Sequence, residues 1–215
     1  GYGGIGYDAV MLGELEWAAL GGKLEGWLDQ HRLHVVSTSA RPTKAKLPLS
    51  PDFQTAAGAS RLAVISYLGP ETLLFAPGAS PDVLEVRGPE AVLARAAELK
   101  KSGAVVVLAA HATEPELAPF ADAADIDLIV RGHISTPEKR LAALGKTPLV
   151  VVGGSEHVGA GALKLSGSRI AQVDYRLEAV DDRWPLDGRV MAVYQAYTHQ
   201  ALRAALDAEK TDGLK

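Results

Sequence analysis

Three short apolar runs between residues 104 and 152 constrain the fold of this chain more than any other feature. They are 104–109, 126–130 and 148–152, and each runs into a polar or glycine-rich turn. Continuous apolar runs of this length are typical of strands buried on both faces. Their alternation with helical segments predicts an α/β fold with a largely parallel sheet and right-handed crossovers.

Two of these runs are followed by a histidine. His111 comes after the first run and His133 after the second. Open α/β sheets place their sites at the carboxyl ends of strands, so histidines in equivalent places favour one shared site. The alternative is that each histidine only caps its own loop.

The other elements follow the same alternation. We expect strands at 7–12, 33–37, 61–67 and 83–86, helices at 22–30, 89–101 and 187–210, and a hairpin at 159–177. The first helix is expected to begin near Gly22, because the Gly21-Gly22 pair interrupts its apolar spacing. Residues 40–60 hold Pro42, Pro48 and Pro51 and are expected to form a surface excursion.

Composition narrows the range of functions. The net charge of −4 and the lack of a lysine–arginine cluster argue against nucleic-acid binding. The absence of cysteine excludes thiolate metal sites and a cysteine nucleophile. No apolar run approaches the roughly 20 residues of a transmembrane segment, and no signal peptide is recognisable. The glycine-rich start at residues 1–6 indicates a processed or truncated piece.

The glycine-rich segments do not indicate a nucleotide-binding function. Glycines 153–154 and 159–161 match neither a P-loop nor a dinucleotide-binding loop, because a hairpin pattern rather than a helix follows them. We expect these glycines to permit tight turns near the site. No nucleophile-elbow motif is present.

Four segments carry a more specific pattern. Residues 7–16, Tyr-Asp-Ala-Val-Met-Leu-Gly-Glu-Leu-Glu, match YDAxxLGNHE in part, and residues 127–133 match DxIxGGHxH in part. Residues 108–111 end a strand in histidine, and residues 147–163 are similar to TPxVxxGxxGxxxGxLxL. In this order the segments resemble the calcineurin-like metallophosphoesterases, in particular the catalytic domain of the 5′-nucleotidases.

The resemblance covers residues 5–178 and implies a fold. The implied fold is an α/β metallophosphoesterase-like two-sheet sandwich flanked by helices (αββα). We expect it in residues 1–180, followed by a C-terminal helical extension at 181–215. That family opens with two further strand–loop units, which carry an Asp-x-His and a Gly-Asp pair of metal ligands. Nothing upstream of Tyr7 matches them, so we expect these units to be lacking. A protein partner is then expected to cover the exposed sheet edge.

The resemblance also implies an altered site. The family's metal-binding asparagine and catalytic histidine fall at Glu14 and Leu15, and the aspartate that orients the histidine falls at Ala18. Leucine cannot donate a proton, so no catalytic residue is assigned. The ligand that serves the second metal falls at Ser135, which leaves no second metal for two-metal hydrolysis.

A single-metal site from Glu14, His111 and His133 is what remains. Two histidines and a carboxylate suit one divalent ion, namely Zn, Fe or Mn. The alternative is no metal, with Glu14 a solvated turn residue and the histidines hydrogen-bonded to loop backbone. Ser135, Gly154 and His157 are expected at the rim of the pocket.

Two functions stay open from the sequence. One is a metal-dependent phosphoester hydrolase related to 5′-nucleotidases, with a phosphate-ester ligand and a degenerate site. The other is a non-catalytic structural or interaction subunit, which the apolar stripe of the predicted helix 187–210 favours. Many members of the family are secreted or periplasmic, so the resemblance implies an extracytoplasmic location.

Overall fold

The computed structural model describes residues 7–20, 33–43, 47–76, 84–133, 140–152 and 157–179, together with positions 26, 28, 188, 192 and 195. The chain divides into two compact units, Asp8–Val180 and the two ends, Gly1–Tyr7 with Asp181–Lys215. The predicted helix 187–210 lies outside the described residues except for three single positions. The division into a domain of residues 1–180 and a helical extension stays a prediction.

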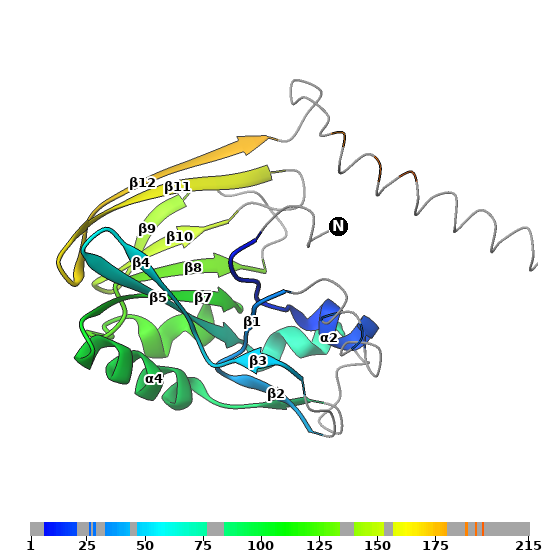
Figure 1. Ribbon diagram of the computed structural model, residues 1–215. Coiled ribbons are helices and arrows are strands. Elements are labelled where there is room, and N and C mark those ends of the chain that lie inside the picture. The colour runs from blue at the N-terminus through cyan, green and yellow to red at the C-terminus, as the bar shows by residue number, and fades with distance from the viewer. Residues whose placement is uncertain are drawn as a thin grey trace, which may run out of the picture. The chain divides into compact units, whose positions relative to one another are not determined.

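A six-stranded sheet forms the centre of the Asp8–Val180 unit (Figure 1). Its strand order is β4-β5-β7-β8-β10-β9. The four inner strands run parallel, and they are β5 (Ser60–Leu68), β7 (Ala104–His111), β8 (Leu128–Gly132) and β10 (Thr147–Val151). The edge strands β4 (Phe53–Ala57) and β9 (Arg140–Leu144) are antiparallel to their neighbours. The predicted largely parallel sheet is confirmed.

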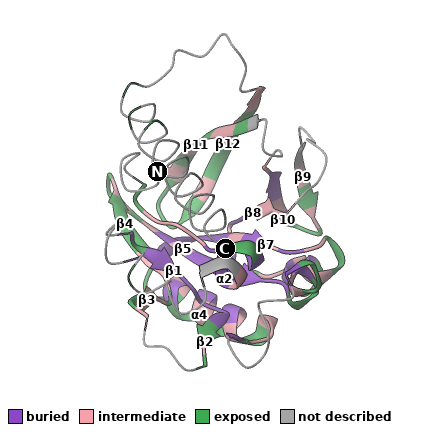
Figure 2. Ribbon diagram, turned by 90° about the vertical axis from the view of Figure 1, so that its right-hand side faces the viewer, coloured by how far each residue is buried: buried purple, intermediate pink, exposed green. Residues whose placement is uncertain are grey.

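Both faces of this sheet are covered. On one face lie α4 (Pro89–Lys101) and the 3₁₀ helix η3 (Pro115–Phe120), and on the other lies the antiparallel hairpin of β11 (His157–Ser166) and β12 (Arg169–Ala179). Alternate residues of β7 serve the two faces, since Val106 packs on the helical side and Val107 on the hairpin side. β7 and β10 are accordingly buried along most of their length, as is the second half of β5 (Figure 2). This double burial explains the continuous apolar runs of the sequence.

The hairpin is fixed to the central sheet by Tyr175. Its phenol donates a hydrogen bond to the Val151 carbonyl oxygen of β10 (2.8 Å), and burial raises the pKa of this phenol. A Cβ at Gly159 would lie 2.9 Å from the Tyr175 hydroxyl oxygen. Gly159 therefore makes room for the ring, and because both Gly159 and Gly161 lie within β11, the expected turn at 159–161 is wrong. The turn at 166–168 is confirmed, with Gly167 at a φ of 59°.

Short elements around the amino-terminal half enclose a second apolar cluster. They are α2 (Glu14–Leu20), β1 (Val35–Val36), β2 (Ala40–Pro42), β3 (Leu49–Ser50), η2 (Pro70–Phe75) and β6 (Leu84–Val86). β1 pairs with β3 in parallel, and β2 pairs with β6 in antiparallel fashion. Trp17 and Leu68 are buried in this cluster, which therefore joins α2 to the carboxyl end of β5.

Hydroxyl groups continue the edge of β5 beyond its pairing with β4. The backbone N–H groups of Ser66 and Leu68 donate to the hydroxyls of Thr38 and Ser39, both at 2.9 Å. The Ser66 hydroxyl donates to the Val36 carbonyl oxygen (3.1 Å). These bonds satisfy buried backbone groups where no strand lies alongside, and they hold β5 in place beside the candidate site.

Several predicted elements need correction. Residues 40–60 contain β2, β3 and β4 rather than a surface excursion, and the predicted strand 7–12 is reduced to a single bridge between Val10 and Val35. A helix that was not predicted, α2, begins at Glu14, and the predicted helix 22–30 lies outside the described residues except for positions 26 and 28, which are helical. The Gly13 N–H donates to the Glu16 carboxylate (2.9 Å), a capping interaction that starts the helix before the glycine pair. β9 was not predicted.

The described residues include no helix that is long and apolar enough to cross a membrane.

Candidate metal site

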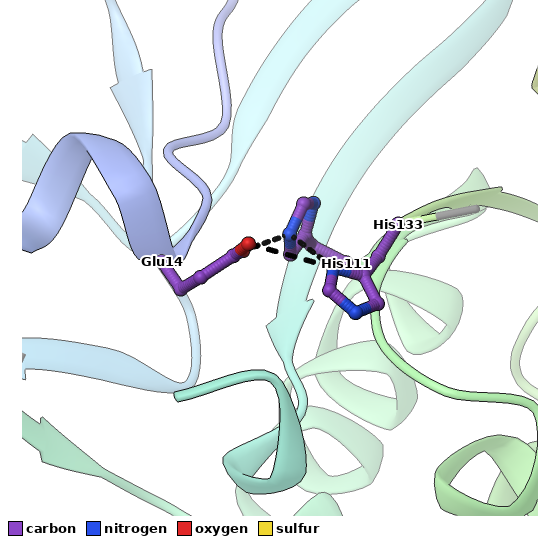
Figure 3. A group of neighbouring side chains, drawn as sticks. All are labelled: Glu14, His111 and His133. Carbon is purple, nitrogen blue, oxygen red and sulfur yellow. Dashed lines mark hydrogen bonds and ion pairs between the residues drawn. The ribbon is translucent and has the colours of Figure 1, made fainter. Parts of the chain in front are cut away.

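Three side chains from separate elements meet at the carboxyl end of the central sheet. Glu14 is the first residue of α2, His111 is the last residue of β7, and His133 directly follows β8 (Figure 3). One ligand atom of each residue lies within 4.8 Å of the others. The structure thus brings together the three residues that the sequence proposed as one site.

The distances within this Glu–His–His triad are short. His133 Nδ1 lies 3.1 Å from His111 Nε2 and 3.6 Å from Glu14 Oε1. His111 Nε2 is in hydrogen-bond contact with Glu14 Oε2. The two imidazole rings meet edge to face, with their ring centres 4.8 Å apart. Ligands about 2.1 Å from a tetrahedral Zn²⁺ lie about 3.4 Å apart. The donor set and its spacing therefore fit one small divalent ion.

Burial affects Glu14 and His111 of the triad in different ways. Glu14 is only 5% exposed, so the expectation of a solvated turn residue is wrong. Burial lowers the pKa of His111; the Glu14 carboxylate opposes this effect and His133 adds to it. A neutral imidazole is the form that ligates a metal, so the environment of His111 favours its ligand form.

Gly13 allows β7 and α2 to approach each other. A Cβ at this position would lie 2.9 Å from His111 Cε1 and 3.1 Å from His111 Nε2. Any larger residue at 13 would therefore push the His111 ring away from Glu14. The glycine that ends the predicted strand has a steric role inside the site.

The loop after β7 is held by a carboxylate that the sequence reasoning missed. Glu116 accepts hydrogen bonds from the backbone N–H groups of Glu71 (2.7 Å) and Thr113 (2.8 Å). The Gly69 N–H donates to the carbonyl oxygen of His111 (2.9 Å). These bonds connect the turn after β5 to the turn after β7, and so fix the backbone that carries His111. No motif in the sequence signalled Glu116.

His133 has a left-handed backbone conformation, with a φ of 57°, which is the one positive value among described residues other than glycine. Non-glycine residues occupy this region at a cost of about 1–2 kcal/mol. Such strain is found at sites where the surrounding structure requires a particular side chain.

This conformation leads to a stability prediction. His133→Gly is expected to be more stable than His133→Ala by about 1 kcal/mol, because both variants lose the imidazole and only glycine adopts a positive φ freely. Urea unfolding of the two metal-free variants measures the difference. A more stable alanine variant would contradict the left-handed conformation.

The remaining predicted site residues are placed less fully. Leu15 is 61% exposed on α2, and Ala18 packs against the second apolar cluster. Ser135 and Gly154 lie outside the described residues, and His157 is described only as the first residue of β11. Their expected place at a pocket rim stays a prediction.

Solved structures show where this fold occurs. The chain is similar to the sulfate thiohydrolase SoxB of Thermus thermophilus (TM-score 0.78, 23% identity, 92% of this chain and 38% of that one). It is also similar to a 5′-nucleotidase precursor from Thermus thermophilus (TM-score 0.74, 20% identity, 92% and 44%). A third is the calcineurin-like phosphoesterase YfkN of Bacillus subtilis (TM-score 0.69, 17% identity, 92% and 71%).

Sequence comparison adds little to this result. No family model matches the chain. The chain is 33% identical over 134 residues to a 3-oxo-tetronate kinase of Pseudomonas fluorescens. The matched region makes up 58% of this chain and 31% of that protein. Because less than a third of the kinase is matched, this similarity shows no family.

The chain spans less than half of the first two solved structures, so it corresponds to one part of those proteins. This chain itself contains the parallel sheet, the hairpin layer and the strand ends that carry the triad. These structures align with about nine-tenths of this chain. They belong to the class of proteins that the motifs at residues 7–16 and 127–133 resemble. The chain has the metallophosphoesterase-like fold of the calcineurin-like phosphoesterases and 5′-nucleotidases.

Proposed function

We propose that this chain is a metallophosphoesterase-fold domain that binds one divalent metal ion through Glu14, His111 and His133. The observation that carries this proposal is the convergence of the three side chains at the strand ends. A buried carboxylate against two imidazoles is costly without a cation to neutralise it. Zn, Fe and Mn are the ions that this donor set suits.

The proposed ligand is a phosphate ester. The 5′-nucleotidase among the solved structures supports this class by its name. A bound divalent ion supplies charge that attracts and polarises a phosphate oxygen. Glu14 and the two histidines leave open positions for such a ligand, because three protein donors do not complete a four-coordinate shell.

We further propose that hydrolysis by this chain is lost or very weak. Leu15 stands where the resemblance places a proton donor, and its exposed apolar side chain cannot take that role. Among the described residues, Glu14, His111 and His133 form the one group of three potential metal ligands. Two-metal hydrolysis needs a second ion about 4 Å away, and these residues support one ion.

An assay on p-nitrophenyl phosphate tests this part of the proposal. With Zn²⁺ or Mn²⁺ added, the wild-type chain is expected to release p-nitrophenol no faster than the His111→Ala His133→Ala variant. The double variant is the matched control, because it lacks two of the three proposed ligands. Metal-dependent turnover that the double variant loses would contradict the degenerate site.

The second candidate is a non-catalytic interaction module, favoured by a backbone edge that no described residue pairs. Val10 pairs with β1 through its N–H to His34 and its carbonyl oxygen to Val36, both at 2.9 Å. No described residue forms a hydrogen bond to the backbone of Ala9 or Met11, whose groups face the other side. Such an edge accepts a strand from a protein partner. An extracytoplasmic location remains part of both proposals.

A further inference from the structure

Exposed apolar side chains gather on the two elements that flank the triad. Five large apolar residues are strongly exposed in the described part of the chain, and three of them lie on α2 and η2. These three are Leu15, Leu74 and Phe75, exposed by 61%, 80% and 66%, and they are here named the apolar rim. α2 and η2 contact each other, and α2 begins with Glu14.

The rim stands on a fixed support. Leu73, the neighbour of the two exposed η2 residues, packs against the second apolar cluster together with Trp17. The buried Thr72 hydroxyl donates to the carbonyl oxygen of Gly69 (2.6 Å), and the Gly69 N–H in turn bonds to His111. Leu74 and Phe75 are therefore held outward by an anchored turn, which is itself tied to the triad.

Phe75 lies beside His133, one member of the triad. Its ring centre is 5.6 Å from the ring centre of His133, with 45° between the two planes. Aromatic rings interact at centroid distances of about 4.5–7 Å, so a group bound beside His133 is within one ring's reach of Phe75. The Phe75 side chain is 66% exposed, so its ring has surface for contact with a second planar group.

The size of the rim decides which kind of partner fits. A whole aromatic side chain buries about 150–250 Å², so three partly exposed residues offer a few hundred Å² at most. A stable protein interface needs about 800 Å² on each partner. The apolar rim alone is thus large enough for a small planar group and smaller than a whole protein interface.

We propose that Phe75 is a specificity-determining residue, which packs against an aromatic group of a ligand whose acid group is held at the Glu14–His111–His133 site. This inference rests on the proposed metal binding. The ligand class is accordingly an aromatic ester of phosphate rather than inorganic phosphate or an alkyl ester.

Titration calorimetry on the Zn²⁺-loaded chain tests the proposal without any turnover. Phenylphosphonate is expected to bind about 3- to 10-fold more tightly than methylphosphonate, the advantage that an aromatic pair supplies. Phe75→Ala is expected to remove this preference and leave the affinity for methylphosphonate unchanged. Phe75→Tyr, which keeps the ring, is the matched control and is expected to retain the preference.

The possible failures are distinguishable. Equal affinity for the two phosphonates, or a phenyl preference that survives in Phe75→Ala, would overturn the role of Phe75 and leave the proposed metal site intact. No zinc-dependent binding of either phosphonate would overturn the proposed function together with this inference. Because Phe75 is largely exposed, its truncation is not expected to disturb folding.

Discussion

Replacing His111 with alanine is expected to weaken the binding of Zn²⁺ by more than about 100-fold. Outer-shell partners of a metal ligand already contribute about 10- to 100-fold to affinity, so the loss of a direct ligand should exceed that range. His111 is also the central member of the triad, since its Nε2 faces both Glu14 and His133. Competition with a fluorescent zinc chelator measures the affinity of the wild type and the variant.

His34→Ala is the matched control for this experiment. His34 contacts the ring of Phe53 at 5.2 Å and is not a member of the triad. Its removal is expected to change the zinc affinity by less than twofold. If His34→Ala and His111→Ala weakened zinc equally, the ion would be bound at surface histidines rather than at the triad.

Truncation of Phe120 is expected to have the largest effect on stability. Phe120 is completely buried between the central sheet and the helices, and its ring meets that of Tyr67 edge to face at 5.0 Å. Large-to-small changes at buried phenylalanines cost about 3–5 kcal/mol, because apolar contacts are lost and a cavity remains. Phe120→Ala should therefore lower the free energy of unfolding by about this amount, as measured in urea.

Phe75→Ala provides the comparison for stability, since it removes the same atoms from an exposed position. Its effect on the free energy of unfolding is expected to stay within about 0.5 kcal/mol. Similar losses in Phe120→Ala and Phe75→Ala would contradict the burial pattern of the helical layer.

The elements that could be predicted are those with a local sequence pattern, such as a continuous apolar run, helix-end residues or an alternation of apolar and polar residues. β7 was predicted because strands buried on both faces must be apolar throughout. The helix at 89–101 was predicted with its correct limits, because Pro89 and the Ser102-Gly103 pair mark its two ends. The hairpin turn at 166–168 was predicted from the alternation on either side of it.

The elements that could not be predicted depend on partners distant in sequence. β4 is an edge strand with three exposed residues in its centre, so it shows no apolar period. β9 is likewise at the edge of the sheet, and among the described strands it pairs with β10 alone. α2 was not predicted as a helix of its own, because its start depends on the contact of Gly13 with the Glu16 side chain, while the Gly21-Gly22 pair interrupts the apolar spacing of the sequence.

Part of the candidate site was also predictable from the sequence. His111 and His133 follow strands of a parallel sheet, and the topology alone brings such residues to one edge. The burial of Glu14 was not predictable, because it depends on how α2 packs against the sheet. Phe75 carried no signal either, since an exposed aromatic residue in a turn has no sequence pattern.

Metal content tests the central claim most directly. The chain, prepared without chelator, would be analysed by mass spectrometry beside the His111→Ala His133→Ala variant. We expect about one equivalent of Zn, Fe or Mn per chain in the wild type and close to none in the variant. A wild-type chain that carries no metal and takes up none on dialysis against these ions would contradict the metal site and leave the interaction module.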